Sequence, residues 1–480
     1  MINSNIIKVK EFLAAAGKEK NTEKITPNSR LLKDLGIDSF SSIELIYNIE
    51  TAFGISIDEK MLHPELSVND LLNYLDAQRQ PTGKINLKSQ ESFINSLNVD
   101  KTLAKKLSFN PYYQTVSGGL SKNIKINHKL MLNFGSNDYL GLSQNKFIKK
   151  SAIDAIKEYG LSMCATPITL GTTQINRALE EKIASFLKQD DAIAYSSGYQ
   201  ANLGIFQALA KENDLVITDK NIHSSLINSI LLSKARLKFF SNNDLITLED
   251  ILKSSQDKRM RFIVIEGLYS TEGTLPQLTE IIELSKTYQA QIIIDDAHGI
   301  GVLGKNGRGV LEHFNAFNDI FLISGSLGKA IGLSGGFLAG NKQTIEYLRY
   351  NSGPYFYSTA LPAHIAKAAI TALAITKKSN KTREEIFSLK DTLYHALSKM
   401  NYQLSSSQAP IFSILFKDTF STLKFSKALF RENIYAVVFL PPSVPQDSPR
   451  IRLIVSAHLN TDIIKKTIRI FNKIKDEYQR

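Results

Sequence analysis

The sequence predicts an α/β protein with a mainly parallel sheet, preceded by a small helical head. From about residue 99 onward, apolar runs of strand length alternate with amphipathic helical patterns, which is typical of a parallel sheet joined by helices. Residues 1–79 contain only short helical patterns. Residues 80–98 are polar, contain Pro81 and Gly83, and have the composition of a linker.

The expected strands in the body are short apolar runs. They are Ile193–Tyr195, Leu215–Thr218, Phe262–Glu266, Ile292–Asp295 and Ile320–Ser324. Helical patterns lie between them, and one of these patterns consists of Leu179, Ile183, Phe186 and Leu187.

The composition is that of an ordinary globular protein, with 43% apolar and 22% charged residues. Cys164 is the single cysteine, which rules out an internal disulfide and fits a reducing compartment. No apolar run approaches the ~18 residues of a membrane span, and the N-terminal stretch is too short and interrupted for a signal peptide. We therefore expect a soluble, cytoplasmic protein without a transmembrane segment.

The net charge of +12 is unevenly distributed along the chain. Residues 1–80 hold 9 Lys and Arg against 12 Asp and Glu, whereas the remainder holds 49 against 34. An acidic head on a basic body suggests that one part docks on the other. No basic run is interleaved with aromatic residues, so we expect no nucleic-acid partner.

In the head, Ser39 follows a short loop and precedes an apparent helix. By itself, a Ser or Asp before a helix is most often an N-cap. The strings DLGIDS, IEL and IETAFGISI together, however, resemble the acyl and peptidyl carrier family across nearly the whole head. The resemblance implies a four-helix carrier domain over residues 1–79. It also implies 4'-phosphopantetheine on Ser39, attached by a phosphopantetheinyl transferase.

Phe40 replaces the leucine that is usual in that family, a change that concerns partner choice more than modification. Asp38 beside the serine can help to bind the metal–phosphate donor. Asp38, Glu44 and Glu50 would form an acidic helix face that the basic body could recognise. A plain solvated helix face explains these three residues equally well.

Two segments of the body carry reactive residues. SGSLGKAIGLSGG, residues 324–336, sets Lys329 among small residues after an apolar strand, as Schiff-base chemistry requires, although phosphate loops and plain turns share this pattern. IIIDDAHGIG, residues 292–301, puts Asp295 and His298 at the end of a buried strand. A carboxylate there can keep a pyridine nitrogen protonated. A metal site is the alternative, but no further cluster has recognisable ligand spacing, so we expect no metal.

Lys329 follows Asp295 by 34 residues, an order and spacing that resemble fold-type I pyridoxal-phosphate enzymes. Further motifs are similar to those of the α-oxoamine synthase family, which includes serine palmitoyltransferase, glycine C-acetyltransferase and amino-oxononanoate synthase. These motifs are LNFGSNDYLGL (132–142), EGLYSTEG (266–273), GKNGRG (304–309) and PPSVPQDSPRIRL (441–453).

The resemblance extends from about residue 108 to 475 and implies the architecture of the body, residues 99–480. We expect a large domain with a mainly parallel seven-stranded sheet over about 150–360. A smaller α+β domain would comprise mainly 361–480 together with 99–149. A homodimer is implied as well, because the phosphate site is shared between subunits in that family.

The resemblance also implies roles for single residues. Lys329 would hold the cofactor, pyridoxal 5'-phosphate, as a Schiff base, and Asp295 would bind its ring nitrogen. His298 would contact the ring oxygen. His223, in DKNIHSS, would stack on the ring face, although a lone histidine is otherwise an ordinary surface or core residue.

The cofactor phosphate would be bound where a strand turns into a helix. Arg452 would bind the carboxylate of the amino acid, with Asn137 assisting, whereas Arg450 would be structural. The residues expected at the phosphate are Ser197, Gly198 and Tyr199 through their backbone amides, Ser326 through its hydroxyl, and Ser358 or Thr359 of a neighbouring subunit.

The implied activity is the decarboxylative condensation of a small amino acid with an acyl thioester, which yields an α-aminoketone and carbon dioxide. Family members normally use coenzyme A thioesters, whereas the fused head suggests an acyl group on Ser39, at about millimolar local concentration. The sequence does not distinguish glycine, alanine and serine, nor the acyl chain. The alternatives are an aminotransferase or decarboxylase of the same fold, which the opening and closing motifs argue against, and a non-catalytic partner subunit, which the presence of Lys329, Asp295 and His298 together argues against.

One stretch, GLSMCATPITLGT (160–172), departs from the family pattern. The family usually has arginine where Pro167 stands and, further on, histidine where Asn176 stands. This region lies near the acyl or coenzyme A entrance in relatives. The loss of a cation fits a donor other than coenzyme A, and it fits a changed amino-acid pocket equally well.

Overall fold

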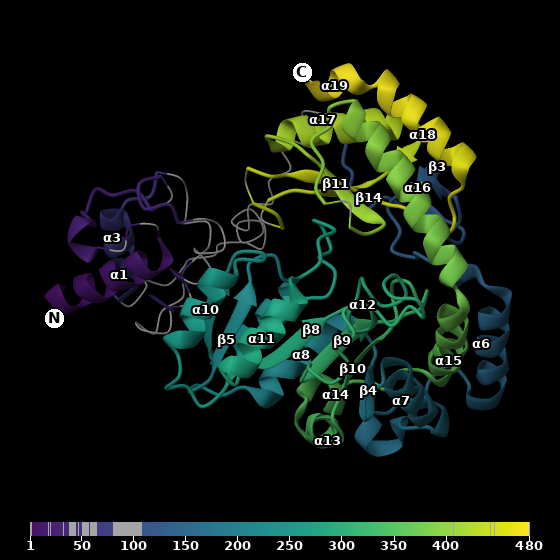
Figure 1. The fold of residues 1–480 in the computed structure, drawn as a ribbon, viewed down its shortest axis with the longest axis horizontal. Coiled ribbons are helices and arrows are strands. Elements are labelled where there is room, and N and C mark those ends of the chain that lie inside the picture. The colour runs from purple at the N-terminus through teal and green to yellow at the C-terminus, as the bar shows by residue number, and fades with distance from the viewer. Residues whose placement is uncertain are drawn as a thin grey trace, which may run out of the picture. The chain divides into compact units, whose positions relative to one another are not determined.

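The computed structural model in Figure 1 describes most of the chain as two units. The described residues are 2–17, 19, 21–31, 33–37, 45–46, 48–49, 57, 65–79, 108–406, 408–441, 443–445 and 447–479. One unit comprises Met1–Phe109 with Leu440–Gln446, and the other comprises Asn110–Phe439 with Asp447–Arg480. Among the described residues, no helix is both long and apolar enough to cross a bilayer.

The N-terminal unit contains helices α1 (Ile2–Ala16) and α3 (Val68–Arg79) and the short helix η1 (Thr22–Lys24). The hydroxyl of Ser67 accepts a hydrogen bond from the Asp70 backbone N–H at 3.1 Å, so α3 begins with a capped turn. Apolar side chains from both long helices and from the residues between them form one buried cluster. Its members include Val9, Leu13, Ile25, Leu31, Leu35, Ile46, Ile49 and Leu71. Ser39, Asp38, Phe40, Glu44 and Glu50 lie outside the described residues.

The larger unit is built around a 7-stranded sheet with strand order β4-β10-β9-β8-β7-β5-β6. Strand β10 is antiparallel to both of its neighbours, and every other pair in this sheet is parallel. The prediction of a mainly parallel seven-stranded sheet is therefore confirmed. The strands are β4 (Asp191–Tyr195), β5 (Leu215–Asp219), β6 (Arg236–Phe240), β7 (Arg261–Glu266), β8 (Gln291–Asp295), β9 (Leu322–Ser326) and β10 (Gly336–Gly340).

The strand predicted at Ile320–Ser324 begins and ends two residues later, at Leu322–Ser326, because its ladder to β10 extends to the pair of Ser326 with Gly336. Two strands of this sheet were missed by the sequence patterns. Strand β6 is an edge strand with exposed Arg236 and Lys238, and β10 begins and ends with glycine, so neither has the apolar run of a central strand.

Helices connect the parallel strands and pack against the sheet (Figure 1). The helix predicted from Leu179, Ile183, Phe186 and Leu187 is α7 (Gln174–Leu187), and all four side chains are buried. The other helices of this region are α8 (Gly198–Leu209), α9 (Ser224–Ser233), α10 (Leu245–Lys253), α11 (Leu278–Thr287), α12 (Val310–His313), α13 (Lys342–Asn351) and α14 (Gly353–Phe356), with the short helix η4 (Pro167–Gly171) before α7.

Two smaller sheets belong to the α+β part of this unit. One has the order β1-β2-β3-β12, with β1 (Val116–Ser117), β2 (Asn123–Ile126), β3 (Lys129–Asn133) and β12 (Ile434–Tyr435). The other has the order β11-β14-β13, with β11 (Ile411–Leu415), β13 (Val437–Phe439) and β14 (Arg450–Ile454). The remaining helices are η3 (Leu142–Gln144), α6 (Lys146–Tyr159), α15 (Ala363–Lys378), α16 (Asn380–Lys399), α17 (Thr419–Arg431), α18 (Thr461–Lys473) and α19 (Lys475–Gln479).

Candidate active site

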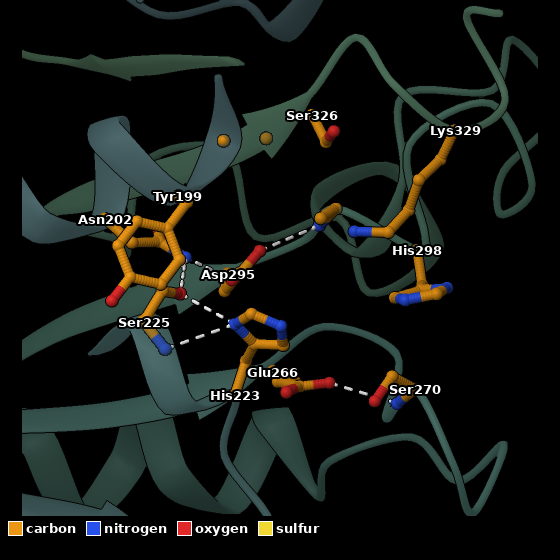
Figure 2. A pocket seen from close by; sticks show the side chains of 13 residues that line it. Tyr199, Asn202, His223, Ser225, Glu266, Ser270, Asp295, His298, Ser326 and Lys329 are labelled. Carbon is orange, nitrogen blue, oxygen red and sulfur yellow. Dashed lines mark hydrogen bonds between the residues drawn. The ribbon is translucent and has the colours of Figure 1, made fainter. Parts of the chain in front are cut away.

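A cavity lies at the C-terminal ends of the parallel strands (Figure 2). Strand β7 ends with Glu266, β8 with Asp295 and β9 with Ser326, and parallel neighbours bring these ends to one edge of the sheet. Seven residues expected at the site line this cavity together with six others. The lining residues are Gly198, Tyr199, Asn202, His223, Ser225, Glu266, Ser270, Asp295, Ala297, His298, Gly325, Ser326 and Lys329.

Asp295 is buried, and both of its carboxylate oxygens accept hydrogen bonds from the protein. Oδ2 accepts from Nδ2 of Asn202 at 2.6 Å, and Oδ1 accepts from the backbone N–H of Ala297 at 3.0 Å. Each carboxylate oxygen has two lone pairs, so capacity remains for a further donor. The two bonds hold the carboxylate in one orientation within the cavity.

Lys329 lies in a loop after β9, and hydrogen bonds between backbone groups of this loop close it. The N–H of Leu327 donates to Gly335 O at 2.9 Å, and the N–H of Gly332 donates to Lys329 O at 2.8 Å. Gly332 and Gly335 have φ values of 77° and 125°, which favour glycine. Burial lowers the pKa of the Lys329 amine, although the Asp295 and Glu266 carboxylates raise it. A lysine amine of lowered pKa is a better nucleophile near neutral pH.

Two histidines line the cavity, and Nδ1 of each has a hydrogen-bond partner within the protein. Nδ1 of His223 accepts from the backbone N–H of Ser225 at 3.2 Å, and Nδ1 of His298 lies 2.9 Å from the hydroxyl of Tyr139. Burial lowers the pKa of His223 and lowers that of His298 much further. Both imidazoles are therefore neutral near pH 7, and the Nε2 atom of each is left for a ligand.

The start of α8 provides a place for an anion. Ser197 is the N-cap, and its hydroxyl accepts from the Gln200 N–H at 3.1 Å. Gly198 and Tyr199 are the first two helical residues, so their N–H groups have no acceptor within the helix. A Cβ atom on Gly336 would collide with the backbone of Gly198, so only glycine permits this close approach of β10 to the helix.

Ser326 lies beside this turn, since a Cβ atom on Gly198 would be 3.5 Å from the Ser326 hydroxyl oxygen. Ser358 and Thr359 do not line the cavity. The hydroxyl of Ser358 accepts from Nε2 of Gln200 at 3.1 Å, and the carbonyl of Thr359 accepts from the Ser196 hydroxyl at 2.8 Å. Both residues thus lie near the start of α8, outside the cavity of the same chain.

Arg452, on β14, is buried, and one of its side-chain donors has no hydrogen-bond partner among the described residues. Its Nη1 donates to Ser270 O at 3.1 Å and its Nη2 donates to Asn137 Oδ1 at 3.4 Å, whereas its Nε has no partner among the described residues. The guanidinium also lies 4.9 Å from the ring centroid of Phe439. Arg452 and Asn137, two residues expected to bind substrate, are thus in contact.

Arg450 differs from Arg452 in its partners. Its Nη1 donates to Glu272 Oε1 at 2.6 Å, its Nη2 to the Ser448 hydroxyl at 2.8 Å, and its Nε to Ser448 O at 3.0 Å. The guanidinium is therefore fully engaged by protein groups. This arrangement fits the structural role expected for Arg450.

Several lining residues were not identified from the sequence. Glu266 is buried, and its Oε2 accepts from the Ser270 N–H at 3.1 Å, but its Oε1 has no partner among the described residues. Burial raises the pKa of Glu266 well above its usual value, and the neighbouring carboxylates add to this effect. Glu266 begins a recognised motif, so a signal for it existed. Asn202 and Ser225 are single polar residues in helical patterns, and nothing local distinguishes them.

Lys329 also lines a second, more open hollow. This hollow combines polar groups, among them Ser136 and Asn137, with apolar side chains such as Leu333 and Ile365. Lys329 thus lies between two hollows, one lined by the residues expected to bind a cofactor and one that includes Asn137.

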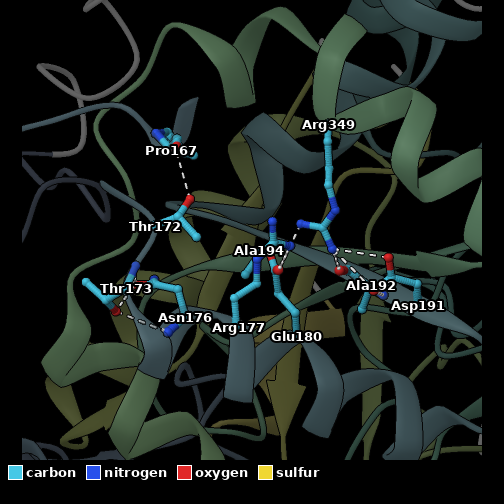
Figure 3. Close-up of polar contacts among 10 residues, drawn as sticks. All are labelled: Pro167, Thr172, Thr173, Asn176, Arg177, Glu180, Asp191, Ala192, Ala194 and Arg349. Carbon is cyan, nitrogen blue, oxygen red and sulfur yellow. Dashed lines mark hydrogen bonds and ion pairs between the residues drawn. The ribbon is translucent and has the colours of Figure 1, made fainter. Parts of the chain in front are cut away.

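The two departures at Pro167 and Asn176 have local structural explanations (Figure 3). Pro167 is the first residue of η4, a position that needs no backbone N–H donor, and its carbonyl accepts from the Thr172 hydroxyl at 2.7 Å. Asn176 is buried and completes a capping box with Thr173 at the start of α7. Its Nδ2 donates to Leu361 O at 2.8 Å.

Beyond Asn176, Figure 3 shows an ion-pair network around the buried Glu180 of the same helix. Glu180 is paired with Arg349 at 2.8 Å and with Arg177 at 2.9 Å, and Arg349 also reaches Asp191. These groups tie α7 to β4 and α13. None of them lines the cavity.

A half-buried lysine, a hydrogen-bonded carboxylate and a helix start with Gly198 as its first residue, gathered at the C-terminal edge of this sheet, are the features of a fold-type I transferase. Residues 129–471 match the family "Aminotransferase class I and II", and residues 9–75 match "Phosphopantetheine attachment site". The chain belongs to the aminotransferase class I and II family, as an α-oxoamine synthase with an N-terminal carrier domain.

Two relatives support this assignment. The 8-amino-7-oxononanoate synthase of Treponema denticola is 34% identical over 364 residues, which cover 76% of this chain and 92% of the relative. That of Thermoanaerobacter pseudethanolicus is also 34% identical, over 73% of this chain and 89% of the relative.

Among solved structures, a serine palmitoyltransferase from S. paucimobilis has a TM-score of 0.78 at 23% identity, and the match covers 82% of this chain and 99% of that one. The 8-amino-7-oxononanoate synthase from Francisella tularensis has a TM-score of 0.64 at 29% identity, covering 72% and 99%. The first of these likenesses concerns the fold alone.

Proposed function

We propose that this chain is an acyltransferase that condenses a small amino acid with an acyl thioester and releases carbon dioxide and an α-aminoketone. The cofactor is pyridoxal 5'-phosphate. The observation that carries the proposal is the single cavity that holds the Lys329 amine, the Asp295 carboxylate and the open start of α8. The family matches and the relatives support the same activity.

The described residues fit the cofactor on their own chemistry. Lys329 would hold its aldehyde carbon, Asp295 its ring nitrogen, and the Gly198 and Tyr199 amides with the Ser326 hydroxyl its phosphate. His223 would stack on the ring face, with its Nε2 left for the substrate, and the free Nε2 of His298 would contact the ring oxygen. When bound, the cofactor withdraws electrons from the substrate's α-carbon and so stabilises negative charge there.

Arg452 and Asn137 would orient the amino acid. The Nε of Arg452 is a buried donor without a partner among the described residues, and a substrate carboxylate would satisfy it. The carbonyl of Ser270 and the amide of Asn137 already hold the guanidinium in place. This preorganised arrangement reduces the entropy that substrate binding costs.

Lys329 would act as the acid and base of the reaction. Because burial lowers its pKa, its amine can take the α-proton of the amino acid near neutral pH. A carbon–carbon bond then forms between the α-carbon and the thioester carbonyl, and the carbon–sulfur bond breaks, so that the sulfur leaves as a thiolate, which takes a proton from solvent. The α-carboxyl departs as carbon dioxide, and Lys329 returns a proton to the same carbon.

We further propose that the acyl group arrives on a 4'-phosphopantetheine arm at Ser39, which a phosphopantetheinyl transferase attaches. The carrier-family match spans residues 9–75 and so includes Ser39. A tether raises the local concentration of the acyl group to about millimolar when it can span the distance. A coenzyme A thioester is the alternative donor.

A homodimer is the assembly that we propose. Apolar side chains are exposed on two neighbouring segments, which the hydrogen bond from Ala360 N to Ala165 O joins at 3.0 Å. The exposed side chains are Leu161, Met163, Ile168, Leu170 and Tyr357. A patch of this kind is typical of a protein interface. Cys164 is free and exposed, which fits the cytoplasmic location that we also propose.

The activity is tested with an amino acid that carries ¹³C in its carboxyl group. The experiment follows this label into the products. Glycine, alanine and serine are each supplied with an acyl-loaded carrier, and mass spectrometry identifies the products. We expect labelled carbon dioxide and an unlabelled α-aminoketone from one of them. Exchange of the amino group, or carbon dioxide without a new carbon–carbon bond, would contradict the proposal and favour an aminotransferase or a decarboxylase.

A companion measurement addresses Lys329. We expect a visible absorbance band from the bound cofactor that borohydride abolishes, and we expect Lys329→Ala to lack it. Lys342→Ala, which changes an exposed lysine on α13, should keep both the band and the activity. A borohydride-sensitive band in Lys329→Ala would refute the role of Lys329.

A further inference from the structure

We propose that Asn202 and Ser225 are positioning residues that orient His223 and keep its ring proton on Nε2, through a chain of hydrogen bonds that starts at Asp295. The inference rests on the proposed function, because it gives His223 its part at the cofactor and substrate. It adds two residues to the site that carry no role so far. Both line the cavity.

Asn202, on α8, connects two acceptors. Its side chain is buried, and its Nδ2 donates to Asp295 Oδ2 at 2.6 Å and to the Ser225 hydroxyl oxygen at 2.9 Å. A carboxylate accepts hydrogen bonds and donates none, so the nitrogen of the amide must face Asp295. The Asn202 Oδ1 has no partner among the described residues, so no bond at this oxygen competes with the two N–H bonds for the orientation of the amide.

Ser225, the second residue of α9, connects Asn202 to His223, and the hydrogen bond from Asn202 determines in which direction the Ser225 hydroxyl donates. Its buried hydroxyl accepts from Asn202, so its own proton must go to another acceptor. Nδ1 of His223 lies 2.7 Å from that hydroxyl and also accepts the Ser225 backbone N–H at 3.2 Å. Two donors therefore converge on Nδ1, which leaves the proton of the neutral ring on Nε2.

Neighbouring contacts hold the two helices at the distance that this chain of bonds requires. Ser229, one turn after Ser225 on α9, donates to Leu203 O at 2.9 Å and accepts from the Phe206 N–H at 3.0 Å. These bonds fix α9 against α8 without touching His223. Ser229 therefore offers a control position that is buried, lies on the same helix junction and is not part of the chain.

The consequence is that His223 presents a hydrogen-bond donor to its ligand. In this state Nε2 can donate to a substrate oxygen but cannot accept the α-proton, which leaves Lys329 as the base. The Asp295 carboxylate, which would bind the ring nitrogen of the cofactor, thereby also determines the orientation of His223 on the face of the cofactor ring.

The test is solid-state ¹⁵N NMR of the full-length chain with pyridoxal 5'-phosphate bound and histidine labelled at both ring nitrogens, with His223→Gln to assign the signals. We expect an unprotonated Nδ1 and a protonated Nε2 for His223 at neutral pH. Asn202→Leu and Ser225→Ala should populate both tautomers, whereas Ser225→Thr, which keeps the hydroxyl, should restore one. Ser229→Ala should leave the wild-type signals.

Kinetics complete the test. We expect kcat to fall about tenfold in Asn202→Leu and Ser225→Ala, a loss of ~1.4 kcal/mol in transition-state stabilisation. An unprotonated Nε2 in the wild type, or an unchanged tautomer in Asn202→Leu, would overturn the inference. Because the NMR signals do not depend on turnover, a wild type with the expected tautomer but no aminoketone would refute the proposed function and not the orientation of His223.

Discussion

The hydroxyl of Tyr139 lies 2.9 Å from Nδ1 of His298, and both side chains are buried. Burial raises the pKa of the Tyr139 phenol, so the hydroxyl keeps its proton and needs an acceptor for it. Burial also keeps His298 neutral by lowering its pKa. Tyr139 therefore donates to Nδ1, and the proton of His298 is on Nε2, where it would meet the ring oxygen of the cofactor.

The first prediction is that Tyr139→Phe weakens the hydrogen-bond donor at Nε2 of His298. Nδ1 of His298 loses its partner, and a buried acceptor without a partner costs about 1–3 kcal/mol. We expect lower stability and a shifted pH dependence of the cofactor absorbance. The control is Tyr402→Phe, which removes a buried hydroxyl that donates to Phe471 O at 2.8 Å. If both variants shift the absorbance equally, His298 does not depend on Tyr139.

The second prediction separates Arg452 from Arg450. Arg452→Lys keeps the charge but loses the planar fork, so we expect KM for the amino acid to rise about 10–100-fold, equivalent to ~1.4–2.8 kcal/mol. Arg450→Lys breaks contacts to Glu272 and Ser448, so it should lower the melting temperature and leave KM nearly unchanged. Steady-state kinetics and thermal unfolding of both variants provide the measurement, and a larger KM change in Arg450→Lys would contradict the assignment.

The third prediction concerns Glu266 and pH. Burial raises its folded-state pKa well above 4.5, so the folded state binds the proton more tightly than the unfolded state does. The contribution of Glu266 to the stability of the wild type should therefore fall as pH rises above about 4.5, until the folded group has titrated. Glu266→Gln mimics the protonated acid, so its advantage over the wild type should grow with pH, by ~1.4 kcal/mol per unit of pKa shift.

Urea unfolding of the cofactor-free protein at several pH values measures this effect. The control is Glu283→Gln, which changes an exposed residue on α11 and should give the same small difference at every pH. A Glu266→Gln advantage that is constant with pH would show that Glu266 is not protonated on folding.

The fourth prediction addresses the carrier. Ser39→Ala should abolish the mass increase that a phosphopantetheinyl transferase produces, while Ser42→Ala should keep it. With an acyl-loaded arm as the donor, turnover should be lost in Ser39→Ala, because the thioester has no attachment point. Full turnover of Ser39→Ala with free acyl-coenzyme A would instead make the carrier dispensable.

Much of the fold followed from the sequence because its signals are local. The runs that became β5, β7 and β8 each contain three or four consecutive apolar residues, as central parallel strands do, and the buried face of α7 repeats at the helical period. Asp295 ends β8, and Lys329 stands three residues after the end of β9. Their order along the chain therefore already indicated a common edge of the sheet.

The connections between side chains were decided only in three dimensions. Asn202 reaches Asp295, Tyr139 reaches His298 and Asn137 reaches Arg452 across 93, 159 and 315 positions of sequence. Hydrogen-bond direction and burial depend on these distant partners, and so do the neutral state of the histidines and the lowered pKa of the lysine. The sequence by itself determined which groups are available for chemistry, whereas the tertiary structure determined which atom of each group carries the proton, because desolvation and hydrogen bonding arise only when distant segments pack together.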